Sequence, residues 1–193
     1  MRSRTAAGEA TYLLEPKNWI IATVVAVGWH AQGVRGLAWG LVAALFAGVL
    51  PTIFISRGVS RGRWRDRNVG DKRPRLIVMG FIIASVAAGL VLLAVCGAPA
   101  TLTGYFVFML VSVAILALIT VVWKISIHCA VASGSVTILI LTFGPWLIGA
   151  YALTAVTAWS RVALKDHTLA QVVAGSVLGA VAALIGYHFI PKG

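Results

Sequence analysis

Two histidines lie in short polar clusters whose residue types suit phosphate chemistry. His128 follows Ser126 and Lys124 at alternate positions, and His167 follows Arg161 by six residues. Guanidinium, ammonium and hydroxyl groups bind phosphate oxygens, while one imidazole can attack phosphorus and another can protonate the leaving oxygen. Together these residues predict a site for phosphoryl transfer.

A third polar cluster is strongly basic. It contains the candidate phosphate ligands Arg67 and Arg73, with Asp66 and Asp71 beside them. Basic segments of this kind also set membrane topology or contact anionic lipid head groups. The cluster therefore supports a phosphate site only in combination with the two histidine clusters.

The elements that must position these clusters are apolar. Of the 193 residues, 60% are hydrophobic and only 11% are charged, with a mean hydropathy of +0.96. A soluble core of this size cannot bury that composition, so we expect an all-α, polytopic membrane bundle of six to seven transmembrane helices. The predicted organisation is a polar N-terminal segment, 1–17, followed by a single membrane domain, 18–193. The apolar runs cover 18–30, 37–56, 76–97, 101–122, 129–143, 145–159 and 169–190.

Glycine and proline predict where two of these runs reverse. Gly144 and Pro145 interrupt a long apolar stretch, which favours two short antiparallel helices over one long helix. The uncharged turn at 97–100 predicts a second hairpin of the same kind. Gly175 and Gly179 are spaced for close helix packing, which we expect within the monomer.

The basic residues predict the membrane orientation. Fourteen of the sixteen Lys and Arg residues fall on the face that carries the three polar clusters. The positive-inside rule assigns that face to the cytoplasm, so we expect a multi-pass cell membrane protein with a cytoplasmic active face. The net charge of +11 is explained by topology, and no nucleic-acid partner is predicted.

The clusters resemble the motifs of the type 2 phosphatidic acid phosphatases, a family that also includes the vanadium haloperoxidases. Arg73 and Pro74 match the end of the first motif, Ser126 and His128 match the second, and the spacing from Arg161 to His167 matches the third. The motif segments fall at 65–75, 123–128 and 160–171, and the resemblance covers roughly half of the chain or more, from residue 66 to residue 179.

Four positions depart from the family pattern. Asp66 stands where the family has a lysine, isoleucines replace the Pro and Gly of the second motif, and Gln171 replaces the third-motif aspartate. Similar segments are found in an atypical bacterial branch of the family, which the chain resembles in these departures.

The resemblance implies a mechanism through a phosphohistidine. His167 would attack phosphorus and His128 would protonate the leaving oxygen. Gln171, one helical turn after His167, would accept the other imidazole N–H and orient the ring. The resemblance also implies a set of phosphate ligands, namely Arg67, Arg73, Lys124, Ser126 and Arg161.

The expected substrate follows from the replacement of the third-motif aspartate by Gln171. Because an amide supplies no negative charge to stabilise an imidazolium, we expect a good leaving group, such as a diphosphate. The predicted substrate is a lipid or prenyl phosphate or diphosphate, with membrane lipids as the other partners and no cofactor.

Two other functions remain open from the sequence. The same pocket suits a prenyl transferase or terpene cyclase that expels diphosphate. Such enzymes usually use Mg²⁺, for which Asp66 and Asp71 are the candidate ligands, and a metal-free version driven by the basic cluster and a protonated His128 is also open. A non-catalytic, lipid-binding membrane scaffold is the second alternative.

Overall fold

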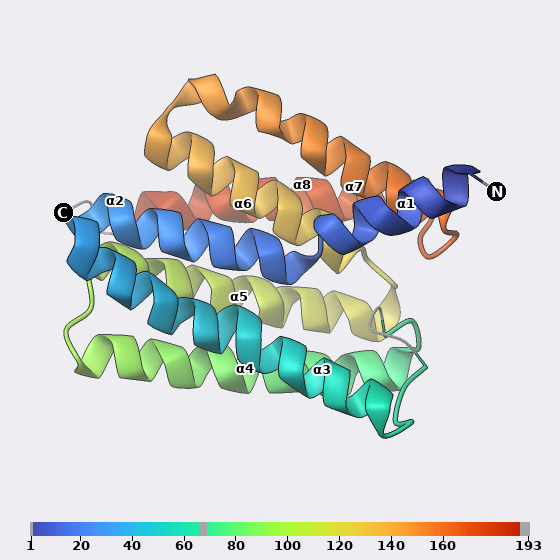
Figure 1. The fold of residues 1–193 in the computed structure, drawn as a ribbon, viewed down its shortest axis with the longest axis horizontal. Helices are drawn as coiled ribbons and strands as arrows, with labels where there is room; N and C mark the ends of the chain where they lie inside the picture. Colours follow the sequence, from blue (N-terminus) through green and yellow to red (C-terminus); the bar gives the residue numbers. More distant parts are fainter. Residues whose placement is uncertain (1, 66–68, 190–193) are drawn as a thin grey trace. The chain divides into compact units, whose positions relative to one another are not determined.

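The computed structural model describes residues 2–65 and 69–189, and side chains from residue 5 onward. Every regular element in these ranges is a helix, which confirms the all-α class (Figure 1). The elements are α1 (Arg2–Leu13), α2 (Pro16–Ala44), a π-helical turn η1 (Leu45–Val49), α3 (Leu50–Ser60), α4 (Lys72–Val95), α5 (Ala100–Val122), α6 (Ile127–Phe143), a 3₁₀-helix η2 (Pro145–Ala150), α7 (Tyr151–Ala163) and α8 (Leu169–Phe189).

Four helical segments among the described residues are long and apolar enough to cross a membrane. They are the nearly continuous segment Thr5–Ser60 and helices α4, α5 and α8. Helix α6 is also apolar but has only 17 residues. The lengths and compositions of these helices therefore support a multi-pass membrane protein.

The chain divides into two compact units, which are described separately. The first unit contains the described residues up to Thr23 together with Ile125–Phe189, and the second contains the described residues of Val24–Lys124. Within the described residues, the polar segment 1–17 is largely helical. It forms α1 and the start of α2, and the Thr11 hydroxyl donates a hydrogen bond to Ser160 Oγ of α7 at 3.1 Å.

In the second unit, α2 doubles back on itself at Gln32 and Gly33. Both residues leave helical geometry, and Gly33 takes a φ of 57°. Gly28 and Gly36 then face each other so closely that a Cβ on Gly36 would lie 1.9 Å from the Gly28 carbonyl oxygen. Only glycine allows this approach, and the expected runs 18–30 and 37–56 are therefore two separate arms.

The remaining hairpin of the second unit is formed by α4 and α5. The turn between them contains Gly97, with a φ of 71°, and Pro99 immediately before α5. This confirms the hairpin predicted from the uncharged turn at 97–100. Since α4 begins where α5 ends, residues near Lys72 and Lys124 lie at the same end of this hairpin (Figure 1).

In the first unit, α6 and α7 form the second predicted hairpin. Helix α6 ends at Phe143, Gly144 has a φ of 115°, and Pro145 opens the short 3₁₀-helix that leads into α7. The hydroxyl groups of Thr137 and Tyr151 are 2.6 Å apart and join the two arms near the turn. Gly144 and Pro145 thus reverse the chain, as the sequence predicts.

Helices α6 and α8 run parallel and pack through small residues. A Cβ on Gly175 would lie 2.5 Å from the Ser126 carbonyl oxygen, and one on Gly179 would lie 2.0 Å from that of Ala130. The Ser133 hydroxyl donates to the Ser176 carbonyl at 2.7 Å, within the same interface. The predicted intramolecular role of Gly175 and Gly179 is therefore confirmed, and it places the beginnings of α6 and α8 side by side.

Candidate functional site

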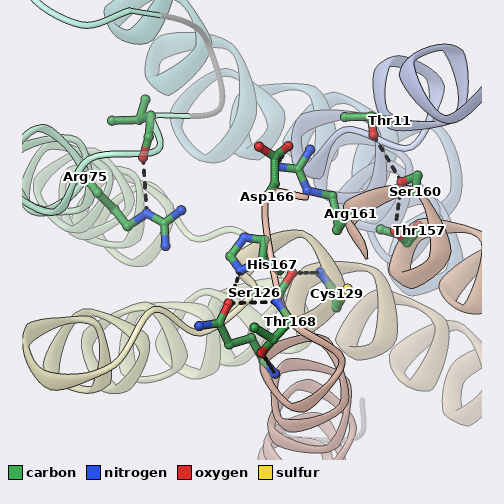
Figure 2. Close-up of polar contacts among 12 residues, drawn as sticks. Thr11, Arg75, Ser126, Cys129, Thr157, Ser160, Arg161, Asp166, His167 and Thr168 are labelled. Atoms are coloured by element: carbon green, nitrogen blue, oxygen red, sulfur yellow. Dashed lines mark hydrogen bonds and ion pairs between the residues drawn. The ribbon is translucent and has the colours of Figure 1, made fainter. Parts of the chain in front are cut away.

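The site is built where α6 and α8 begin. Ser126 precedes α6 as its N-cap, and its hydroxyl accepts a hydrogen bond from the Cys129 backbone N–H at 3.5 Å (Figure 2). The Ser126 backbone N–H donates in turn to the Gln171 carbonyl at 3.3 Å. This bond joins the second and third motif segments directly. Two parallel helix N-termini, each with a positive dipole end, therefore lie next to each other and favour an anion.

Helix α8 begins with a capping box that includes Gln171. The Gln171 backbone N–H donates to Thr168 Oγ1 at 3.4 Å, and the Thr168 backbone N–H donates to Gln171 Oε1 at 3.1 Å. The two residues thus satisfy each other's exposed amide groups at the helix start. Because a backbone N–H is always a donor, this contact fixes the amide of Gln171 with its oxygen toward Thr168.

The same oxygen sets the tautomer of His167. Gln171 Oε1 lies 3.1 Å from His167 Nδ1. Since the oxygen can only accept, Nδ1 must carry the proton, and in the neutral imidazole Nε2 then holds the lone pair. His167 is 7% exposed, so packing also limits the motion of the ring. The predicted contact between His167 and Gln171 is present.

Arg161 is the most deeply buried cation of the described chain. Its side chain is 1% exposed, and its Nη2 makes an ion pair of 2.8 Å with Asp166 Oδ2 (Figure 2). Burying a charge of this kind is costly unless it is paired, and Asp166 supplies the pairing. A phosphate group bound here would compete with Asp166 for the guanidinium.

The loop between α7 and α8 fixes Arg161 relative to His167. The Arg161 carbonyl accepts hydrogen bonds from the backbone N–H groups of Asp166, at 3.1 Å, and His167, at 3.3 Å. Lys165 adopts a φ of 60°, which turns the chain sharply between α7 and α8. The spacing of the third motif therefore has a structural reason, because it lets the turn close with Arg161 in the last turn of α7 and His167 just before α8.

The second histidine belongs to the same unit. His128 is half-buried in the first turn of α6, two residues after Ser126. The structure therefore gathers five of the predicted site residues in the first unit, namely Ser126, His128, Arg161, His167 and Gln171.

Other predicted residues belong to the second unit. Arg73 and Asp71 are exposed at the beginning of α4, and Lys124 is half-buried just after α5. The predicted ligands Arg67 and Asp66 lie outside the described residues. Within the described part of the chain, no group of three or more His, Cys, Asp or Glu residues is arranged to hold a metal ion.

The sequence did not single out two residues that the structure makes prominent. Asp166 directly precedes His167, and the structure pairs it with Arg161. Arg75, two residues after the predicted ligand Arg73, is the buried arginine of this segment, at 6% exposure, whereas Arg73 is exposed. Its Nε donates to the Val69 carbonyl at 3.3 Å (Figure 2).

The position of Arg75 in the sequence indicates that its side chain is buried. It precedes the buried residues Val78 and Met79 by three and four positions, so it shares their helix face. Arg73 lies about 200° round the helix from Arg75 and points to a different side.

No family model matches this chain, and no match was found among curated proteins or solved structures.

Proposed function

We propose that this chain is an integral membrane phosphatase that hydrolyses a lipid or prenyl phosphate or diphosphate through a phosphohistidine. In this proposal it belongs to an atypical branch of the type 2 phosphatidic acid phosphatases. The observation that carries the proposal is the arrangement of His167, whose Nδ1–H faces Gln171 Oε1 at 3.1 Å and whose backbone N–H donates to the Arg161 carbonyl at 3.3 Å. A neutral imidazole with a fixed tautomer presents Nε2 as a nucleophile.

The first chemical step transfers the phosphoryl group to His167. Nε2 forms a bond to phosphorus, and the bond from phosphorus to the leaving oxygen breaks with its electron pair. His128 donates a proton to that oxygen. In the second step water attacks the phosphohistidine, His128 takes a proton from the water, and inorganic phosphate leaves while Nε2 regains its lone pair.

The surrounding groups stabilise the negative charge of the phosphoryl oxygens. The N-termini of α6 and α8 lie side by side, and the Arg161 guanidinium is 99% buried where water screens it little. The Ser126 hydroxyl, at the start of α6, supplies a further polar group.

The amide at residue 171 favours a substrate with a good leaving group. Gln171 orients His167 without adding negative charge, so it stabilises the charged imidazole less than a carboxylate would. The terminal phosphoryl group of a diphosphate leaves behind a phosphate monoester, which needs little protonation. A prenyl diphosphate also has an apolar tail suited to a membrane protein.

The proposed topology has six to seven transmembrane segments with the site on the cytoplasmic face. Support comes from the break at Gln32 and Gly33, which divides one long helical segment into two arms, and from the short hairpin of α6 and α7. In this topology the basic residues of the loop after α3 are cytoplasmic, as the positive-inside rule requires.

The test uses the full-length protein in nanodiscs with farnesyl diphosphate or phosphatidic acid. Phosphate release is measured for the wild type, for His167→Ala and for His188→Ala, a matched control because His188 lies exposed at the far end of α8. We expect only His167→Ala to fall to the background rate. Substrate labelled in its terminal phosphate should leave an acid-labile, hydroxylamine-sensitive label on His167.

The same experiment distinguishes the other two functions. Release of intact diphosphate with a hydrocarbon or cyclic alcohol, dependent on Mg²⁺, would replace the phosphatase by a terpene synthase or prenyl transferase. Binding of the substrate without any product, unchanged in His167→Ala, would indicate a lipid-binding scaffold.

A further inference from the structure

Helix α7 carries its polar residues inside and its apolar residues outside. All of its buried residues are polar, namely Thr154, Thr157, Ser160 and Arg161. Its large exposed side chains are apolar, namely Leu153, Val156, Trp159 and Val162. In a membrane bundle, polar side chains face the interior or a water-filled cavity, because hydrocarbon cannot satisfy their hydrogen bonds. The buried face of α7 therefore gives the first unit a polar interior.

The hydroxyl groups on this face are spaced for water molecules. Thr154, Thr157 and Ser160 recur at every third residue, and side chains three residues apart on a helix lie about 5–6 Å apart. A water molecule that bonds to two oxygens, each at about 2.8 Å, spans nearly the same distance. Thr157 and Ser160 donate their protons to backbone carbonyls of α7, both at 2.8 Å, so each oxygen keeps a lone pair that can accept from water.

Buried polar atoms at the start of this row have no hydrogen-bond partner among the described residues. They are Thr154 Oγ1, Thr23 Oγ1 and Trp19 Nε1, on side chains at most 9% exposed. Trp19 belongs to a buried cluster that packs against Ala150 and Tyr151, and Thr154 follows these two residues by one turn. An unsatisfied buried polar group costs free energy, and ordered water is its usual partner where protein atoms supply none. A water molecule can accept from the indole N–H and donate to a threonine oxygen.

At its other end the row reaches Arg161. This guanidinium is 1% exposed, and Asp166 pairs with its Nη2 at 2.8 Å. Burying an ion pair costs free energy unless polar groups around it replace part of the lost hydration. Because Ser160 directly precedes Arg161, water held by Ser160 and Thr157 would lie near the guanidinium and lower that cost.

We propose that the buried face of α7 binds a row of ordered water molecules, from Thr154 and Trp19 at one end to Arg161 at the other. The ligand is water, and the site belongs wholly to the first unit. Its hydration does not depend on any catalytic activity. One consequence rests on the proposed function: the row supplies water for hydrolysis of the phosphohistidine by a route inside the unit, which a lipid tail at the membrane face does not block.

The test compares two tryptophans of matched burial by radiolytic footprinting. Trp19 is 9% exposed and Trp64 is 8% exposed, but Trp64 Nε1 donates to the Ile55 carbonyl at 2.9 Å. Full-length protein in nanodiscs receives a brief X-ray pulse, which makes hydroxyl radicals from water, and oxidation of each tryptophan is followed by peptide mass spectrometry. Because these radicals react close to where they form, a buried side chain is oxidised quickly only when water is bound beside it. We expect Trp19 to be oxidised several times faster than Trp64.

Thr154→Val tests whether α7 holds this water. Valine keeps the shape of threonine without the hydroxyl, so oxidation of Trp19 should slow while that of Trp64 stays the same. The thermal midpoint of unfolding should fall, because a bond to water is lost. In a dry interior it would rise, since a methyl group would replace an unsatisfied hydroxyl. Thr120→Val is the control and should leave Trp19 unchanged, because Thr120 is similarly buried in the second unit and donates to the Leu116 carbonyl at 2.7 Å.

The end of the row at Arg161 is tested at Cys129. This thiol is fully buried near Arg161 (Figure 2). We expect it to be oxidised in the same experiment despite its burial, and Thr157→Val should slow its oxidation.

Three results would overturn the proposal. The first is equal oxidation of Trp19 and Trp64, or a higher thermal midpoint for Thr154→Val, since either would show a dry interior. The second is fast oxidation of Trp19 that persists in Thr154→Val, because the water would then enter through transient opening of the unit. The third is oxidation of Cys129 that is unaffected by Thr157→Val, because the row would then not extend to Arg161.

Discussion

The close packing of α6 on α8 predicts that Gly179→Ala destabilises the protein. In the structure a Cβ at residue 179 would lie 2.0 Å from the Ala130 carbonyl oxygen and 2.8 Å from the carbonyl carbon. Both atoms belong to a helix backbone, so no side chain can rotate away. The two helices must therefore separate to accommodate a single methyl group.

The size of this effect follows from the geometry. A carbon atom and a carbonyl oxygen normally approach to about 3.3 Å, so the helices must move apart locally by about 1.3 Å. The bond from Ser126 N–H to the Gln171 carbonyl is already 3.3 Å long, and a displacement of this size would break it. Over-packing costs about 1–3 kcal/mol and the lost bond about 1 kcal/mol, against about 0.5–1 kcal/mol gained from alanine in a helix. The net loss is about 1–3 kcal/mol.

Cys129 provides the assay, because it is fully buried at the start of α6. Its reaction with a fluorogenic maleimide during heating reports unfolding, in a Cys96→Ser background that removes the exposed thiol. We expect Gly179→Ala to lower the midpoint by about 2–10 °C. Gly80→Ala is the matched control, since nothing lies within 4 Å of a Cβ there. If Gly179→Ala and Gly80→Ala melted at the same temperature, the close approach of α6 and α8 would be wrong.

Three further predictions concern the cap of α6, the loop after α3 and the orienting amide. Ser126→Ala removes the acceptor for a backbone N–H and should destabilise the protein by about 1 kcal/mol in the same thermal assay, and an unchanged midpoint would show that the cap contributes nothing. Gly58→Ala places a Cβ 1.7 Å from the ring of Trp64 and should expel that ring into solvent. Its tryptophan emission should shift to the red, and the shift should be absent in a Trp64→Phe background. Gln171→Glu keeps the acceptor for His167 and adds a charge, so phosphate release from a monophosphate should rise relative to release from a diphosphate. A constant ratio of the two rates would argue against the role given to this amide.

The features that the sequence predicted well are local ones. Gln171 lies one helical turn from His167, so their contact depends on little more than α8 being a helix. Gly144 and Pro145 interrupt any helix in which they occur, which is why the hairpin of α6 and α7 was predictable. The spacing of Gly175 and Gly179 likewise indicated close packing, although not the partner helix.

The features that the sequence missed depend on contacts between distant or irregular segments. The ion pair of Arg161 with Asp166 forms because Lys165 takes a left-handed conformation, which no periodic pattern predicts. The burial of Arg75 depends on how α4 packs within the second unit. The N-terminal segment is polar in composition, yet α1 packs on α7 with Thr11 buried, because a few small and hydroxylated residues suffice for that contact.

The distribution of charge around His167 bears on the proposed chemistry. The family pattern places a carboxylate on the histidine, whereas here the neighbouring carboxylate, Asp166, pairs with Arg161 and an amide faces the imidazole. The ion pair is neutral as a whole, and the Gln171 amide adds no charge beside the imidazole. The field that attracts a phosphate must then come largely from the two helix N-termini, until the incoming anion displaces Asp166 from the guanidinium. That exchange would release the positive charge of Arg161 only when substrate is present.

On the proposed mechanism, Asp166→Asn should therefore strengthen the binding of inorganic phosphate to the His167→Ala protein, while Lys165→Gln, one residue away and exposed, should not. Weaker binding in Asp166→Asn would mean that Asp166 is needed to hold Arg161 in place, and the exchange would be the wrong description of the site.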